Sequence, residues 1–214
     1  MPQFKDSMNI AVIAANGRLG KEFVLAALEA GHSVRAGVRG DNTLPPHKNL
    51  EIMSCDATNI DDLKNLFHNQ TVVVSAIGHV KGSKANVQTV ATEQTVSAMN
   101  ELGIRRYVDV TGTGVRFPED KVSLVDRILN MGVSVMDKSR VQDGIDHQEV
   151  LKTSSLDWTT IRVLKLQNVP ARPYKLTLHG PTKWYVGRQE VASAMLEVIE
   201  ANSFVKQAPI ISYV

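Results

Sequence analysis

The residues best suited to chemistry lie in a short loop near the N-terminus. Gly17 and Gly20 follow an apolar run, and they precede a segment in which apolar residues recur with helical spacing. Gly17 lets the backbone approach a ligand, and Gly20 lets a helix pack closely on a strand. The backbone N–H groups at the start of such a helix attract phosphate oxygens. The spacing therefore predicts a dinucleotide phosphate site. An ordinary strand-to-helix turn with two glycines is the alternative.

The end of the second predicted strand carries a cation, Arg39, and no acid. An Asp or Glu about 20 residues after the phosphate loop would bind a ribose 2′-hydroxyl. A guanidinium instead binds a 2′-phosphate through two hydrogen bonds. The sequence therefore favours NADP(H) over NAD(H). Asp41 keeps NAD(H) open, and a solvated loop charge is the alternative for Arg39.

Two further strand ends fit the same cofactor. Asp56 could accept a hydrogen bond from the adenine amino group, and capping the helix that begins near Ile60 is its alternative role. The small residues at 76–78 would let the backbone pass beside the ribose and pyrophosphate. The predicted cofactor-binding residues are Ala14, Asn16, Gly17, Arg18, Leu19, Arg39, Asp56, Ala57, Ala76, Ile77, Gly78 and Thr111.

Three polar residues at strand ends are candidates for catalysis. Thr111 and Thr113 follow the fifth predicted strand, where they could donate to the nicotinamide amide or to a substrate oxygen. The alternative is a glycine-rich turn with two capping hydroxyls. His79 follows the fourth strand and could face substrate, although a lone loop histidine is more often solvated. No metal site is predicted, because the six histidines show no ligand spacing.

Strands and helices alternate along the chain that must position these residues. Strands are expected at 9–14, 33–38, 50–55, 71–76, 106–110 and 158–163, and helices at 19–30, 60–67, 86–102, 138–151 and 188–201. Continuous apolar strands separated by helices predict a Rossmann-like α/β fold, with a doubly wound parallel sheet covered on both faces. We expect one domain over 1–214, with 164–186 forming a small lobe that includes a hairpin at 174–186. Residues 209–213 are expected as a last edge strand.

Composition narrows the classes of protein. The chain has 24 Lys and Arg against 22 Asp and Glu, a net charge of +2, which argues against a nucleic-acid or membrane-surface binder. One cysteine excludes an intramolecular disulfide. No apolar run approaches the roughly 18 residues of a membrane helix. Because residues 1–7 lack a signal-peptide core, we expect a loose extension there and a cytoplasmic protein.

The motifs together resemble the atypical short-chain dehydrogenases, in particular the NmrA-like proteins and the NADPH-dependent flavin reductase and biliverdin reductase B group. The first loop resembles G-x-x-G-x-x-G, with Ala14 in place of the first glycine. Binding then requires that Ala14 keep a negative φ. The segments 157–163, 174–181 and 187–192 resemble further motifs of this group, so the resemblance covers nearly the whole chain.

The chain departs from that superfamily in lacking its Tyr-x-x-x-Lys dyad. Residues 111, 178 and 189, four positions after the first three tyrosines, are Thr, Leu and Gln, and the dyad positions fall near Val141 and Ile145. The resemblance therefore implies an NAD(P)H-dependent reductase whose acceptor is a conjugated small molecule of flavin, quinone or tetrapyrrole type. An NADP-binding sensor of NmrA-like type, acting through a protein partner, is the alternative. A scaffold that no longer binds nucleotide is the third.

Overall fold

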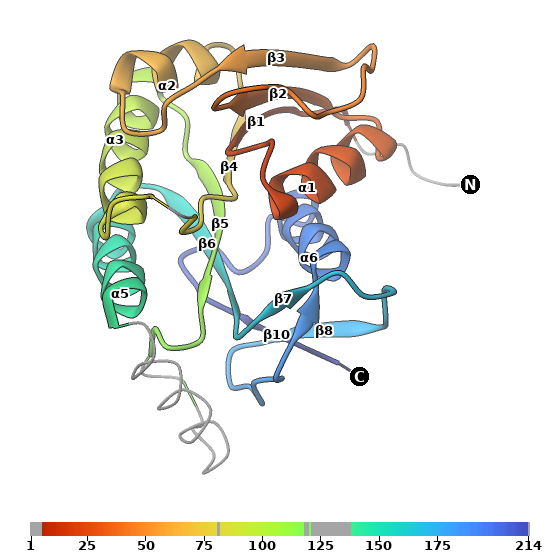
Figure 1. Ribbon diagram of the computed structural model, residues 1–214, viewed down its shortest axis with the longest axis vertical. Helices are drawn as coiled ribbons and strands as arrows, with labels where there is room; N and C mark the ends of the chain where they lie inside the picture. Colours follow the sequence, from red (N-terminus) through yellow and green to blue (C-terminus); the bar gives the residue numbers. More distant parts are fainter. Residues whose placement is uncertain (1–5, 81, 118–119, 121–137, 214) are drawn as a thin grey trace.

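An eight-stranded sheet forms the centre of the computed structural model, which describes residues 6–80, 82–117, 120 and 138–213. The strand order is β3-β2-β1-β4-β5-β6-β10-β8 (Figure 1). The strands are β1 (Asn9–Ile13), β2 (Ser33–Val38), β3 (Leu50–Ser54), β4 (Val72–Ser75), β5 (Arg106–Gly112), β6 (Asp157–Val163), β8 (Tyr174–Thr177) and β10 (Ile210–Tyr213). Neighbouring strands run parallel except β10 and β8. The order reverses direction at β1, between β2 and β4, and ligands of such sheets bind at this switch point.

Helices cover both faces of the sheet, as the sequence predicted. They are α1 (Arg18–Glu29), α2 (Ile60–Phe67), α3 (Val87–Leu102), α5 (Lys138–Thr153) and α6 (Arg188–Glu200). The helices α1 and α6 pack together on one face, while α3 packs between α2 and α5 on the other (Figure 1). Within β1, Ile10 and Val12 join the core under α1 and α6, whereas Ala11 and Ile13 join the core under α2 and α3. The Rossmann-like fold is therefore confirmed. No helix of the described residues is long and apolar enough to cross a membrane.

Helix boundaries follow local signals that the sequence carries. Gly31, just past α1, has a φ of +88°, and Gly103 ends α3 with a φ of +69°. Both conformations favour glycine, which explains where these helices stop. The helix α2 begins after Asn59, whose side chain accepts hydrogen bonds from two backbone N–H groups of the first turn. The alternative role of Asp56 as the cap of this helix is therefore wrong.

The C-terminal region pairs differently from our prediction. The hairpin at 174–186 does not form. Instead β8 pairs antiparallel with β10, and β9 (Val186–Gly187) pairs parallel with β7 (Leu166–Gln167) in a separate two-stranded sheet. The strand β10 is therefore interior, between β6 and β8, and the edge belongs to β8. Apolar pattern predicts a strand but not its partner, so both errors share one cause. Most of the expected N-terminal extension, and most of 115–135, for which no element was predicted, lie outside the described residues.

Candidate functional site

The loop between β1 and α1 is a tight turn that leaves the start of the helix open. The N–H of Gly17 donates to the carbonyl oxygen of Ala14 at 2.9 Å. A Cβ on Gly20 would lie 2.3 Å from that same oxygen, so the helix packs on the turn as closely as the sequence predicted. The first turn of α1 has neither a side-chain cap nor an acid. Its N–H groups therefore remain available for an anion, which fits a pyrophosphate.

Ala14 departs from the expected backbone conformation. Its φ is +57°, so the expectation of a negative φ is wrong. The turn needs a left-handed residue here, because the carbonyl of Ala14 must reach Gly17 while the chain continues into α1. A left-handed conformation costs a residue with a Cβ about 1–2 kcal/mol. The phosphate loop thus keeps its glycine-type geometry without the glycine.

Asn16 ties the phosphate loop to the segment that follows β2. Its Oδ1 accepts hydrogen bonds from the backbone N–H and the hydroxyl of Thr43, at 2.9 and 2.5 Å, and its Nδ2 donates to the carbonyl of Asp41. The amide that we predicted to contact the cofactor is therefore used within the protein. It holds the connection that carries Arg39 beside the phosphate loop.

A cavity of about 260 Å³, here called the loop cavity, opens beside this turn. It is lined by Ile13, Ala14, Asn16, Gly17, Arg39, Cys55, Asp56, Ala57, Thr58, Ala76, Ile77, Gly78, Val80, Ser83 and Val87. Nine of the predicted cofactor residues are in this lining. The other three are elsewhere, because Arg18 is exposed, Leu19 is buried and Thr111 lines a second cavity. Sequence reasoning missed the apolar wall residues and Thr58, which no motif marks.

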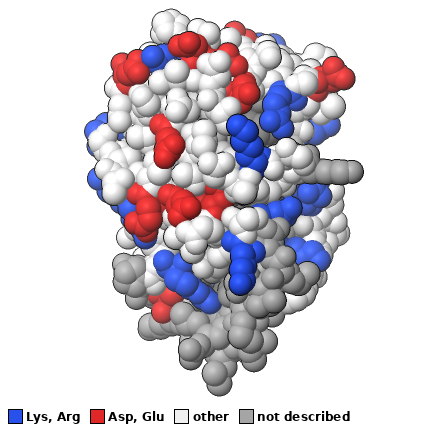
Figure 2. Space-filling view, turned by 60° about the vertical axis from the view of Figure 1, so that its left-hand side comes forward, with Lys and Arg blue, Asp and Glu red and all other residues white. Residues whose placement is uncertain are grey.

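The charges around the loop cavity suit an anionic ligand that carries an amino group. The backbone N–H and hydroxyl of Thr58 donate to Asp56, and together with Arg39 they hold the pKa of this carboxyl below its usual value. Burial, with the charges of Asp62 and Asp56, raises the pKa of the Cys55 thiol to about 12, so it stays protonated. Figure 2 shows Lys and Arg side chains in a broken vertical band on one face of the molecule. Such a band attracts anions.

A second cavity, of about 270 Å³ and here called the threonine cavity, continues along the same edge of the sheet. It is lined by His79, Gln88, Thr111, Gly112, Thr113, Gly114, Val115, Arg140, Val141, Gly144 and Leu164. All three candidate catalytic residues are in this lining. The two cavities adjoin, because Gly78 lines the first and His79 the second, as do Val87 and Gln88.

No tyrosine is found among the described residues that line either cavity. Val141, at the expected place of the dyad tyrosine, presents an aliphatic side chain to the threonine cavity. Tyr107 is buried in β5, and burial together with the charge of Asp109 raises its pKa well above the usual value. A tyrosine acid of the usual kind is therefore missing from the described site.

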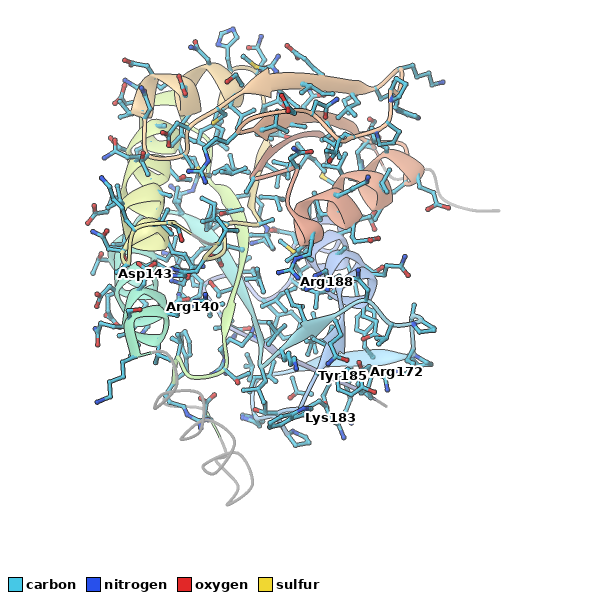
Figure 3. All side chains as sticks on the ribbon, in the orientation of Figure 1. Arg140, Asp143, Arg172, Lys183, Tyr185 and Arg188 are labelled. Carbon is cyan, nitrogen blue, oxygen red and sulfur yellow. The ribbon has the colours of Figure 1, made fainter. Side chains whose placement is uncertain are left out.

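A buried carboxylate, Asp143, supports the wall of the threonine cavity. It accepts hydrogen bonds from the backbone N–H groups of Gln88 and Thr89, both at 2.9 Å, and from the Thr89 hydroxyl at 2.6 Å. Nε2 of His79 lies 2.9 Å from Oδ2 of Asp143. Figure 3 shows Asp143 with Arg140 on α5. Sequence reasoning missed Asp143, because only the packing of α5 on α3 shows that it faces inward.

A second buried pair lies behind this wall. His147, one turn after Asp143 on α5, has its Nε2 3.2 Å from Oδ2 of Asp109 in β5. Burial lowers the pKa of His147, but the carboxylate of Asp109, together with the carbonyl and charge of Asp143, raises it further, so that the pKa lies above its usual value. Its Nδ1 lies 3.3 Å from the carbonyl oxygen of Asp143. The two pairs therefore share one helix, which fixes the position of Asp143.

The segment 164–186 is fastened to the start of α6. Arg188 donates to Oδ1 of Asn168 at 2.6 Å and to the carbonyl of Leu166 at 3.1 Å. Burial and the nearby charge of Arg18 lower the pKa of Arg188. In Figure 3, Arg188 on α6 and the pair Arg140 and Asp143 on α5 lie on opposite sides of β5 and β6. The segment therefore has a fixed attachment opposite α5.

Comparison with known proteins agrees with this geometry. A family model described as NAD(P)H-binding matches residues 14–202. The chain is 24% identical over 198 residues to the chloroplast protein TIC 62 of Arabidopsis thaliana, covering 81% of this chain and 29% of that protein. It is 25% identical over 118 residues to a 3 beta-hydroxysteroid dehydrogenase/Delta 5-->4-isomerase of Mycobacterium tuberculosis, covering 50% of this chain and 32% of that protein. The chain thus spans about a third of the length of these curated relatives.

Solved structures share the fold over almost the entire chain. A short-chain dehydrogenase/reductase from Veillonella parvula, in complex with NADP, superposes with a TM-score of 0.80 at 20% identity, covering 97% of this chain and 95% of that one. A candidate NADH-flavin reductase from Streptococcus pneumoniae gives a TM-score of 0.79 at 21% identity, covering 97% and 100%. The chain belongs to the NAD(P)H-binding family, which agrees with the resemblance to the atypical short-chain dehydrogenases.

Proposed function

We propose that the protein is an NADPH-dependent reductase that passes a hydride to a conjugated small-molecule acceptor, such as a flavin, a quinone or a linear tetrapyrrole. The observation that carries this proposal is the meeting of two cavities at Gly78 and His79. One adjoins a phosphate loop, and the other contains polar groups but no described tyrosine. Family membership supports an oxidoreductase, and the structural neighbours that bind NADP or are assigned to flavin reduction support this choice of cofactor and acceptor.

The residues present would hold the cofactor along both cavities. The first-turn N–H groups of α1 would bind the pyrophosphate, and Asp56 would accept from the adenine amino group. Arg39 would bind the 2′-phosphate, which supports NADPH over NADH. The nicotinamide would lie in the threonine cavity, where its reduced ring supplies a hydride. Thr111 would donate to its carboxamide, consistent with its place in that lining.

The lining of the threonine cavity favours a flat, conjugated acceptor. Gly112, Gly114 and Gly144 place backbone at the wall, and Val141 and Leu164 add apolar contacts. A conjugated acceptor delocalises the charge that a hydride brings, so its reduction does not depend on a tyrosine acid. A simple ketone or alcohol substrate would need that acid. The proposal therefore excludes simple carbonyl reduction.

Two linked measurements test the proposal. Calorimetric titration with NADPH and with NADH, at one salt concentration, should give tight binding of NADPH and much weaker binding of NADH. NADPH oxidation is then followed with menadione, flavin mononucleotide and biliverdin as acceptors, and at least one of them should accelerate it. Absence of heat with both nucleotides would overturn the proposal.

An NADP-binding sensor is the second candidate, and one observation favours it. Val141 puts an unreactive side chain where the superfamily places its catalytic tyrosine. A sensor would bind NADPH tightly and show no acceptor-dependent oxidation. The same pair of measurements therefore separates the sensor from the reductase.

A further inference from the structure

We infer that His79, oriented by Asp143, donates the proton that the acceptor needs, and that this acceptor is a conjugated carbonyl compound, a quinone or an enone. The inference rests on the proposed reductase function and identifies a residue and a substrate class within it. It assigns to His79 the task that a tyrosine performs in the dyad.

The position of His79 is the first support. It directly follows Gly78, so its imidazole lies where the two cavities adjoin. The acceptor would lie in the threonine cavity beside the nicotinamide, with its reacting carbon next to that ring. The His79 side chain is only 9% exposed, so it belongs to the wall and not to the solvated loop.

The support of His79 by Asp143 is the second. Three donors from the first turn of α3 fix the carboxylate, and its Oδ2 lies 2.9 Å from Nε2 of the imidazole. The carboxylate therefore lies at ion-pair distance from the imidazole, although Nε2 makes no hydrogen bond in this geometry. A carboxylate that orients a histidine for proton transfer is a common arrangement in enzymes. Asp143 is a positioning residue, because it touches the imidazole and not the cavity.

The charged groups around the imidazole come from two directions. From α5, Asp143 contacts it and Arg140 lines the same cavity. Behind them, His147 is paired with Asp109 and contacts the carbonyl of Asp143 and not its carboxylate. Among the described residues, His79 therefore lines the cavity that would hold the acceptor, whereas His147 is buried behind it.

The proton and electron balance selects the acceptor. The hydride forms a C–H bond at the conjugated carbon and leaves a negative charge on the carbonyl oxygen. An N–H bond of the His79 ring breaks as an O–H bond forms at that oxygen, and a proton from solvent then restores the ring. The cofactor is oxidised by two electrons and the acceptor is reduced by two. A carbonyl oxygen is an acceptor of hydrogen bonds before and after reduction, which suits it to an imidazole N–H.

The test compares His79→Gln with His68→Gln, a change at an exposed histidine at the end of α2. Both variants should bind NADPH within about twofold of the wild type, because Gln at either place removes no cofactor contact proposed above. With menadione as acceptor, His79→Gln should lower the rate of hydride transfer by about 100-fold or more, whereas His68→Gln should leave it unchanged.

Chemical rescue distinguishes proton donation from a structural role. His79→Ala leaves space in the cavity wall, so added imidazole should restore part of the rate. Wild-type-like turnover by His79→Gln, or a slow His79→Ala that imidazole does not rescue, would overturn the inference while leaving the reductase intact. A wild type that binds NADPH but reduces neither quinone nor enone while it reduces flavin would also overturn it. Failure with every acceptor would overturn the proposed function, and the inference with it.

Discussion

The loop cavity and the threonine cavity adjoin at one edge of the sheet, but they are built in different ways. Both cavities have glycines in their walls, and the loop cavity is built around the turn at Ala14–Gly17 and small residues at strand ends. The threonine cavity depends on side chains from the loop after β4 and from α3, β5 and α5, which are fixed by buried pairs such as His79 and Asp143. A backbone site can recognise a common cofactor in many related chains, whereas a side-chain site can differ between close relatives.

The difference also appears in how each cavity holds its charges. In the loop cavity, Asp56 and Arg39 are exposed and interact through solvent. Around the threonine cavity, Asp143 is 2% exposed and each of its carboxylate oxygens accepts a backbone hydrogen bond. A ligand in the loop cavity therefore contacts charged side chains that can change conformation. A ligand in the threonine cavity contacts charged groups whose positions are already fixed. Substitutions in the two cavities should separate these behaviours.

The largest expected effect tests the backbone origin of the loop cavity. Gly20→Ala should lower the free energy of unfolding by about 2 kcal/mol, because the new Cβ would lie 2.3 Å from the Ala14 carbonyl oxygen. The gain in helix propensity, about 1 kcal/mol, opposes this but is smaller than the steric cost. Gly112→Ala, in the threonine cavity, meets nothing closer than 3.9 Å and should cost less than about 0.5 kcal/mol. Denaturant unfolding measures both, and equal losses would contradict the comparison.

The next effect concerns the exposed charge of the loop cavity. Arg39→Ala should weaken NADPH binding by about 10-fold to 100-fold, the range expected when a charged hydrogen bond is lost. NADH binding should change by less than about threefold, because it lacks the 2′-phosphate. Calorimetry at low salt measures both, with Arg105→Ala at another exposed arginine as the control. An equal loss for NADPH and NADH would show that Arg39 does not select the cofactor.

The wall behind the threonine cavity should make stability depend on pH. The pKa of His147 lies above its ordinary value of 6.5, because the effect of Asp109 outweighs that of burial. The stabilisation from this shift is complete below the ordinary value and is lost as pH rises through the raised one. The free energy of unfolding should therefore fall as pH rises above the ordinary pKa of histidine. His147→Gln should flatten that slope, whatever it does to the overall stability, and an unchanged slope would assign it to other groups.

The sequence was sufficient for the parts of the molecule that local signals define. Apolar runs located the strands and helices of the sheet core, and Gly17 and Gly20 located the tight turn before α1. These features depend on residues close together in the chain. The fold and most of the loop cavity could therefore be predicted from the order of the residues alone.

The errors and omissions concern contacts between distant segments. The partner of β8 is β10, about 35 residues away, and no local pattern encodes that choice. Asp143 meets the start of α3 across 54 residues, so its inward orientation depends on helix packing. The positive φ of Ala14 was missed for another reason, because the residue type argues against it and the turn overrides that preference.

The smallest expected effect comes from Ala14 itself and tests whether the loop cavity is impaired. Ala14→Gly removes about 1–2 kcal/mol of left-handed strain, while the greater freedom of glycine in the unfolded chain takes back about 0.4–1 kcal/mol. The free energy of unfolding should therefore rise by roughly 0.5 kcal/mol. Ala15→Gly is the matched control, because Ala15 is fully buried without a positive φ and should lose stability.

NADPH binding by Ala14→Gly should stay within about threefold of wild type, because the phosphate contacts come from N–H groups of the next turn. A much larger gain in affinity would mean that the methyl group obstructs the cofactor, and the backbone of this cavity would then no longer be enough to define its function.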